Sequence, residues 1–183
     1  MNSVIAKIKS VFKQRGTEQY GTECVTQLQH ALQSAQLAEE TGASASLITA
    51  ALMHDIGHIF ESPDLPNSCE DNLDDKHEFV ANAWIKKHFG PEVADPIRLH
   101  VVAKRYLCTK DPTYEKTLSP TSLKSFRDQG GKMDAEEISQ FETEPFFREA
   151  LKLRQWDDLA KVKDKQTPPI DYFIPVLESC FKP

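Results

Sequence analysis

The chain has 183 residues, of which 39% are hydrophobic and 27% are charged, and its formal net charge is −6. This composition is typical of a soluble globular protein, the acidic balance argues against a nucleic-acid surface, and no apolar run is as long as a membrane span. The four cysteines form no C-x-x-C pair, which is typical of free thiols in a reducing cytoplasm. We therefore expect one domain over residues 1–183, located in the cytoplasm and binding neither nucleic acid nor membrane. The oligomeric state stays open.

The spacing of apolar residues predicts helices along the chain, and no segment shows sustained strand alternation. Helices are expected over residues 1–14, 22–40, 44–59, 75–89, 92–107, 145–163 and 172–180, with a short one beginning near residue 134. Two segments are expected to lack regular structure: a polar surface loop over residues 61–74 and a possible functional loop over residues 109–132. The predicted fold class is all-α.

A His-Asp pair is the first candidate site. Residues 51–58 read Ala-Leu-Met-His-Asp-Ile-Gly-His, so His54 and Asp55 are adjacent and His58 follows one helical turn later. Positions i and i+4 share a helix face, so His54 and His58 are expected to be neighbours. Imidazole and carboxylate ligands suit iron, manganese or zinc, and the two oxygens of Asp55 allow it to bridge two cations.

Four further ligand candidates each lie on a separate expected helix: His30, His77, His100 and Asp157. Each has a structural alternative, since His30 could be a buried core histidine and His77 a surface residue at a helix start. Together with the His-Asp pair they make six ligands. That number is too large for one catalytic ion with an open site, and it suits two ions that share a carboxylate.

The Asp157-Asp158 pair offers two carboxylates, and helical periodicity distinguishes them. The stripe that contains Asp157 also contains Ala150, Leu153 and Ala160. Asp157 is therefore predicted to point inward as a ligand, and Asp158 is predicted to be solvated.

These residues lie in a chain that resembles the HD-domain phosphonate oxygenases over residues 20–163. The HD pair alone is a weak indication of that activity. Three segments make the resemblance more specific: the Tyr20-Gly-Thr-Glu23 run ahead of His30, the run from His100 to Leu107 that contains Lys104, and the run from Gln129 to Met133. The resemblance implies an HD-domain helical bundle with a dinuclear metal site in its core.

The resemblance further implies a mixed-valent centre of two iron ions, Fe2+ and Fe3+. The implied ligands of one iron are His30, His54, Asp55 and Asp157. Those of the second iron are His77 and His100, with Asp55 as the bridge. Tyr20 would occupy a position on the second iron until substrate displaces it.

The substrate implied by the resemblance is a small phosphonate that reacts with O2. The reaction would cleave the C–P bond of 1-hydroxy-2-(amino or trimethylammonio)ethylphosphonate and release phosphate with glycine or glycine betaine. Glu23 would hydrogen-bond Tyr20 and then meet the substrate amine. The residues implied around the phosphonate are His58, Lys104, Ser122 and Gln129.

Three alternatives stay open. An HD-type phosphohydrolase would need one metal, held by His30, His54, Asp55 and Asp157, with a metal-bound water as nucleophile. A diiron oxygenase resembling myo-inositol oxygenase would share the ligand order but lack the Tyr20 and Glu23 pair. A catalytically silent HD module would need none of the complete ligand set.

Overall fold

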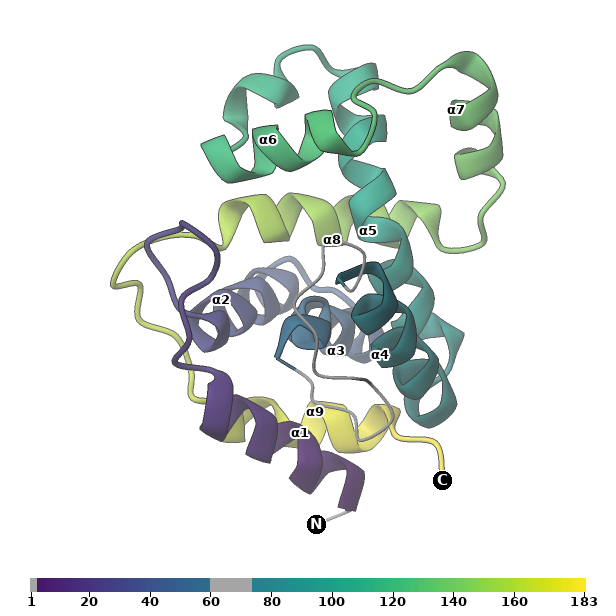
Figure 1. Cartoon of the computed structure of the whole chain (residues 1–183). Helices are drawn as coiled ribbons and strands as arrows, with labels where there is room; N and C mark the ends of the chain where they lie inside the picture. The colour runs from purple at the N-terminus through teal and green to yellow at the C-terminus, as the bar shows by residue number, and fades with distance from the viewer. Residues whose placement is uncertain (1–2, 60–73) are drawn as a thin grey trace.

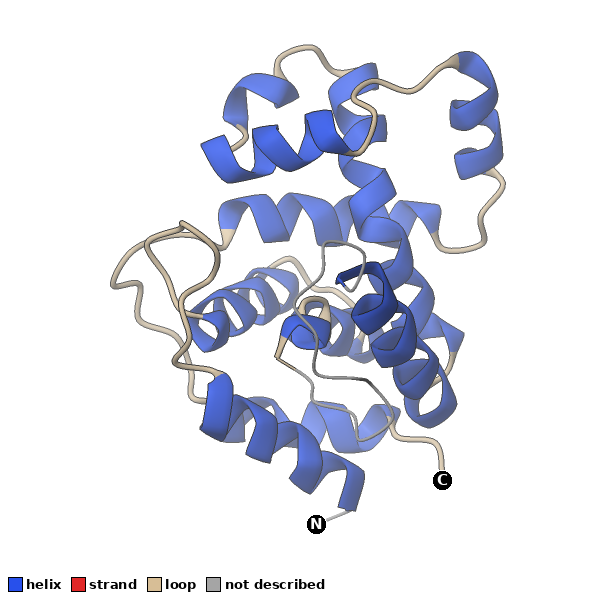
Figure 2. Ribbon diagram, viewed as in Figure 1, coloured by secondary structure: helices blue, strands red, loops and turns tan. Residues whose placement is uncertain are grey.

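The computed structural model describes residues 3–59 and 74–183, and within the second range it describes side chains from residue 81 onward. Apart from an isolated antiparallel bridge between Gln19 and Thr26, the regular elements of the described residues are helical (Figure 2), which confirms the all-α prediction. The elements are α1 (Ser3–Arg15), α2 (Gln27–Glu40), α3 (Ala45–Met53), η1 (Ile56–His58), α4 (Asp74–Phe89), α5 (Pro91–Lys110), η2 (Tyr114–Thr117), α6 (Pro120–Asp128), α7 (Ala135–Glu142), α8 (Phe147–Leu159) and α9 (Ile170–Cys180).

Helix α3 lies at the centre of the bundle, where α2, α5, α8 and α9 contact it (Figure 1). Every residue from Leu47 to Met53 is buried. A short helix that is apolar or small on all sides is stable only when other helices cover each face. The C-terminal end of α3 therefore delivers His54 and Asp55 into the interior of the protein.

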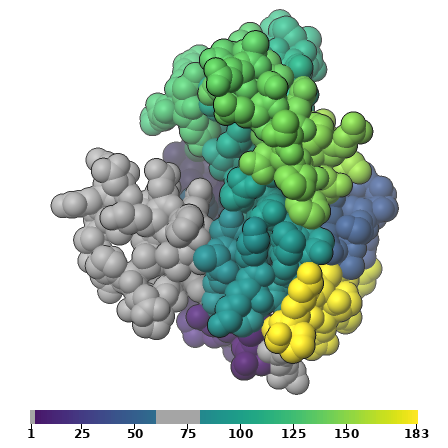
Figure 3. Space-filling model, turned by 90° about the vertical axis from the view of Figure 1, so that its right-hand side faces the viewer, coloured from purple at the N-terminus to yellow at the C-terminus, as the bar shows by residue number. Residues whose placement is uncertain are grey.

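A smaller apolar cluster lies where α7 and the adjoining segments cover α5 and α8. Its buried members are Leu99, Ala103, Met133, Phe141 and Ala150. Seen from the side, the surface of α7 lies above that of α4 and α5, and α9 lies at the opposite end (Figure 3). The central part of α5 thus connects the two packed regions and carries His100 and Lys104 between them.

The segment 109–132, predicted to be irregular, contains the 3-10 turn η2 and the helix α6. Ser119 begins α6 as its N-cap, since its hydroxyl accepts from the amide of Ser122, and Pro120 occupies the first turn. Only Ser122 and Phe126 of this helix are buried. Its apolar periodicity was therefore too weak to reveal it, and the prediction was wrong.

Several helix boundaries also differ from the prediction. The helix expected over residues 22–40 begins only at Gln27, where Thr26 forms a capping box with Gln29. The helix expected over residues 145–163 spans Phe147–Leu159, and the one expected over residues 44–59 ends at Met53. The N-terminal helix is confirmed as α1. No helix among the described residues is both long and apolar enough to cross a membrane.

Candidate metal centre and substrate cavity

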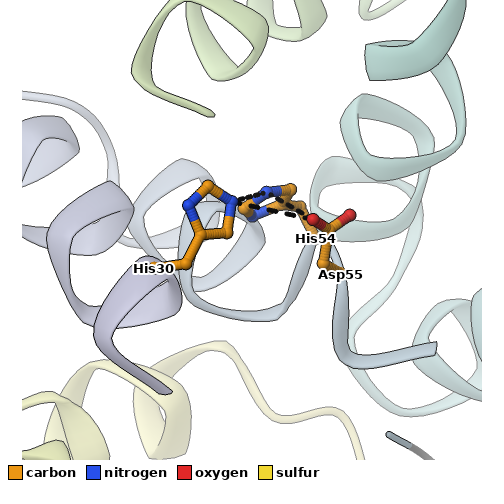
Figure 4. Close-up of side chains that lie close together, drawn as sticks. All are labelled: His30, His54 and Asp55. Carbon is orange, nitrogen blue, oxygen red and sulfur yellow. Dashed lines mark hydrogen bonds and ion pairs between the residues drawn. The ribbon is translucent and has the colours of Figure 1, made fainter. Parts of the chain in front are cut away.

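Three possible metal ligands meet where α2 passes the C-terminal end of α3 (Figure 4). His30 projects from α2, His54 caps α3 and Asp55 follows it. Nε2 of His30 lies 3.0 Å from Nε2 of His54, and Oδ2 of Asp55 lies 3.6 Å and 3.3 Å from these two nitrogens. The three side chains surround a position suited to one cation.

Backbone carbonyls fix the orientation of both imidazole rings. Nδ1 of His30 lies 2.9 Å from the carbonyl oxygen of Ala160, and Nδ1 of His54 lies 2.9 Å from that of Ala51. Because a carbonyl only accepts, each Nδ1 carries the hydrogen and donates it. In the neutral rings the two Nε2 lone pairs then face each other, and this contact needs a proton or a metal cation. Metal-binding histidines commonly donate their second nitrogen in this way.

Asp157, on α8, adds a fourth possible ligand and is 1% exposed. Its Oδ1 lies 3.4 Å from Nε2 of His30 and 3.9 Å from Nε2 of His54, and none of the residues described here supplies it with a hydrogen bond. Its Oδ2 lies 2.8 Å from Nη1 of Arg154. A buried carboxylate oxygen without a donor is costly, and a cation bound by these residues would satisfy it. The donor set therefore fits a metal ion.

The charges around His54 favour its protonated form. Burial lowers the pKa of its imidazole, but the carboxylates of Asp55 and Asp157 raise it, and the resulting pKa is about 9. Burial raises the pKa of Asp55, yet the neighbouring histidines, His54 first, hold it well below its usual range. Burial also raises the pKa of Asp157, but Arg154 together with His30, Lys161 and His54 holds it well below its usual range. The cluster keeps its carboxylates ionised and requires a cation beside them.

The other oxygen of Asp55 faces a different histidine. Nε2 of His100, on α5, lies 3.6 Å from Oδ1 of Asp55, and Nδ1 of His100 lies 2.5 Å from the carbonyl oxygen of Ile97. Burial outweighs the Asp55 carboxylate and lowers the pKa of His100 to about 4, so this ring is neutral near pH 7. The two oxygens of Asp55 thus face separate sets of imidazoles, as a bridging carboxylate does. The side chain of His77, the other ligand expected here, lies outside the described residues.

His58 does not share a helix face with His54, because α3 ends before it. In a longer α-helix the amide of Asp55 would donate to the carbonyl of Ala51. Here Nδ1 of His54 donates to that carbonyl, and the 3-10 turn η1 follows. Nε2 of His58 instead lies 3.9 Å from Oδ1 of Asp55, on the same side as His100. The structure thus places His58 beside Asp55 rather than beside His54 on one helix face.

Tyr20 lies directly against the cluster. Its ring stacks on His30 with centroids 4.0 Å apart, and its hydroxyl donates to Oδ2 of Asp55 at 2.6 Å. This is the oxygen that faces His30 and His54, whereas the resemblance implied a position beside the second iron. The hydrogen bond expected between the Tyr20 and Glu23 side chains is not formed: the Tyr20 hydroxyl donates to Asp55, and the Glu23 carboxylate accepts from the Ser119 hydroxyl. Burial and the nearby carboxylates raise the pKa of Tyr20 well above its usual value, so the hydroxyl keeps its proton.

A cavity of about 400 Å³ opens from the cluster between α5, α6 and the end of α8. Its lining includes Tyr20 and all the expected substrate contacts, namely Glu23, His58, Lys104, Ser122 and Gln129. It also includes two residues that the sequence did not single out, Arg154 and Lys161. The structure therefore gathers the expected substrate contacts around one space.

Lys104 is 2% exposed and its ammonium donates to Ser125 at the cavity wall. Burial, aided by Arg154, lowers the pKa of Lys104 to about 8. Ser122 is buried and accepts from Lys161 at 2.9 Å, and Gln129 lies at the exposed end of α6. The Lys104 ammonium is a charge-assisted donor for an anion in this small cavity, and the Ser122 hydroxyl is a second donor beside it.

Buried charges on α8 are the largest feature that the sequence did not reveal. Arg154 is 4% exposed, and its Nε lies 2.8 Å from Oδ2 of Asp158. Asp158 was predicted to be solvated, but its side chain is only 7% exposed and also accepts from the hydroxyl of Tyr114 at 2.6 Å. The prediction was wrong because η2 covers this side of α8. The spacing Arg154-x-x-Asp157-Asp158 was the available signal, since such i, i+3 and i, i+4 pairs interact on a helix.

Comparison with known proteins agrees with this geometry. A family model described as HD domain matches residues 28–160. The chain belongs to the HD domain family. It is 38% identical to the [1-hydroxy-2-(trimethylamino)ethyl]phosphonate dioxygenase (glycine-betaine-forming) of Leisingera caerulea, over 96% of this chain and 89% of that protein. It is 40% identical to the hydroxymethylphosphonate dioxygenase of Gimesia maris, over the same shares of each chain.

A third relative is an uncharacterized protein of Acanthamoeba polyphaga mimivirus, 37% identical over 94% of this chain and 81% of that protein. The chain is thus an HD-domain protein homologous to phosphonate dioxygenases, which confirms the resemblance. The buried His/Asp cluster, whose side chains could hold a metal ion, lies within the matched residues.

Proposed function

We propose that this HD-domain protein is a diiron dioxygenase that cleaves the C–P bond of a small 1-hydroxyalkylphosphonate with O2. The observation that carries this proposal is the position of Asp55, with Oδ2 near His30 and His54 and Oδ1 near His100. A hydrolase with a single metal ion near Oδ2 of Asp55 has no need of His100 beside Oδ1. The kinship with two phosphonate dioxygenases supports the same reading.

We propose His30, His54, Asp55 and Asp157 as ligands of one iron, and Asp55, His77 and His100 as ligands of the other. The bound irons would supply the binding and activation of O2. Atoms balance without another reactant, because the C–P bond breaks and both oxygen atoms of O2 enter the products. Carbon is oxidised to a carboxylate and phosphorus to phosphate.

The side chains of the cavity would bind and orient the substrate. Lys104 and Ser122, with Gln129 and His58 at the rim, provide the donors that a dianionic phosphonate needs. Glu23 supplies a negative charge at the other end of the substrate. Tyr20 caps the cluster by donating to Asp55, and we propose that substrate displaces it from this position.

The decisive experiment measures phosphate release by protein loaded anaerobically with Fe2+, with and without added O2. Three compounds are compared: hydroxymethylphosphonate, (1-hydroxy-2-aminoethyl)phosphonate and its N-trimethylated analogue. We expect O2-dependent phosphate from at least one, with formate, glycine or glycine betaine as the respective co-product. Phosphate release from ordinary phosphomonoesters without O2, and none from the phosphonates, would contradict the proposal in favour of a phosphohydrolase.

A further inference from the structure

Lys161 has no role in the proposed function so far, although its ammonium lies inside the cavity. It follows the C-terminal end of α8, and its side chain is only 10% exposed. The ammonium donates to Ser122 at 2.9 Å and lies 3.9 Å from Oε1 of Glu23. It also lies 3.7 Å from Oδ1 of Asp157 and 3.6 Å from Oδ1 of Asp158.

Of the three carboxylates around Lys161, Glu23 depends on it most. Asp157 and Asp158 are both bound by Arg154. Glu23 accepts from the neutral hydroxyl of Ser119, and Lys161 is the cation nearest to it among the contacts of the described residues. The charge of Glu23, which a substrate ammonium would use, is therefore already balanced by the protein.

The position of Lys161 also matches that of a bound ammonium in a second respect. Its nitrogen lies 5.9 Å from the centroid of the Tyr20 ring, within the range of a cation–π contact. A carboxylate beside an aromatic face is the environment that binds quaternary ammonium groups. Here the protein's own lysine fills that environment.

Little remains of the cavity wall for a second cation. Tyr20 is the one Phe, Tyr or Trp among the described residues that line the cavity, and His30 covers one face of its ring. A trimethylammonium group has no N–H with which to compete for Glu23. It would also lie next to Lys161, and like charges brought together disfavour a ligand.

We propose that Lys161 is a specificity-determining residue that replaces the cation of the substrate. The preferred substrate is then a 1-hydroxyalkylphosphonate with an uncharged end, of which hydroxymethylphosphonate is the simplest. This inference rests on the proposed function. The reaction balances, since hydroxymethylphosphonate and O2 together contain the atoms of formate and phosphate.

The test compares kcat/KM of the iron-loaded enzyme for hydroxymethylphosphonate and for the trimethylammonio compound. We expect a higher kcat/KM of the wild type for hydroxymethylphosphonate. Lys161→Met should shift the ratio of the two kcat/KM values toward the trimethylammonio compound by about tenfold, which is the effect of a cation–π contact that the substrate could then make in place of Lys161. Lys161→Arg keeps the cation and should keep the preference. Lys163→Met, at an exposed position two residues on, is the matched control and should match the wild type.

Anaerobic binding of the two phosphonates to the iron-loaded variants, measured by calorimetry, gives a readout independent of turnover and of a partly unfolded fraction. An equal loss of affinity for both compounds in Lys161→Met would make Lys161 a phosphonate contact and overturn the inference. A wild-type preference for the trimethylammonio compound would overturn it while leaving the proposed function intact. Failure of all three phosphonates to release phosphate with O2 would remove the proposed function and this inference with it.

Discussion

Replacing Arg154 with Met should separate the role of this buried charge in stability from its role in metal binding. Its guanidinium lies 2.8 Å from Oδ2 of Asp157 and holds both oxygens of Asp158. Breaking a buried ion pair by removing one partner costs about 3–5 kcal/mol. For a chain of this size each kcal/mol lowers Tm by about 2–4 °C, so the expected decrease is about 6–20 °C.

The same substitution should weaken iron binding, because Arg154 orients Asp157 and lowers the pKa of its carboxyl. Loss of a group that supports a metal ligand typically costs about 10–100-fold in affinity. With a higher pKa, Asp157 is protonated more readily, so iron should be lost at a higher pH during acid titration than in the wild type.

The assay is thermal unfolding by circular dichroism, together with Fe2+ affinity from competition with a chelator under anaerobic conditions. Lys152→Met, at an exposed position on the same helix, is the control and should change stability by no more than about 0.5 kcal/mol. An unchanged iron affinity in Arg154→Met, despite a lower Tm, would refute the argument that Arg154 positions Asp157 and leave it a structural residue.

Three other results are expected. Fe2+ at about 100 times its Kd should stabilise the protein by about 2.7 kcal/mol. The affinity of the protein for Fe2+ should increase with pH up to about 9, because the metal must displace the proton of His54. An Fe2+ affinity that stays constant between pH 6 and 9 would contradict this displacement. Tyr20→Phe keeps the ring on His30 but removes the donor to Asp55, so more O2 should be consumed per phosphate released, as an oxygen electrode would measure; unchanged coupling would exclude the capping role. The pKa of Lys104 is lowered to about 8, because burial, Arg154 and Lys161 disfavour its charge more than Asp157 and Asp158 favour it. Its cation is therefore lost as pH rises through that value, kcat/KM should fall above about pH 8, and Lys104→Arg should remove this decline; a decline that persists in the arginine variant would assign it to another group.

The sequence could indicate the His/Asp cluster because part of its signal is local. His54 and Asp55 are covalent neighbours, and the stripe of Ala150, Leu153 and Asp157 points inward on α8 as helical periodicity requires. The all-α class followed from the same periodicity. The position of Asp55 between His30 and His100 depends on how α2, α3 and α5 pack. The tautomer of His30 depends on the carbonyl of the distant Ala160. Helical periodicity reveals neither.

The wrong prediction for Asp158 and the failure to single out Lys161 share a different cause. Asp158 and Lys161 are charged residues near a helix end, where sequence reasoning expects solvent. Their burial depends on η2 and α6, which cover the end of α8 and lie in the segment predicted to be irregular. Because η2 and α6 were not predicted, the burial of the charged side chains beside the cavity was not predicted either.

The end of α8 couples the metal cluster to the substrate cavity. Within five consecutive residues it provides the Asp157 carboxylate, the Ala160 carbonyl that orients His30, and the Lys161 ammonium. Two relatives of similar identity to this chain bear the names of different phosphonates, so overall similarity does not select the substrate. Under the proposed function, we infer that the charge of Lys161 in the cavity wall contributes to that choice. Because Lys161 is only four residues from Asp157, a change of the proposed substrate preference at this position has to preserve the backbone that holds the proposed metal ligand Asp157.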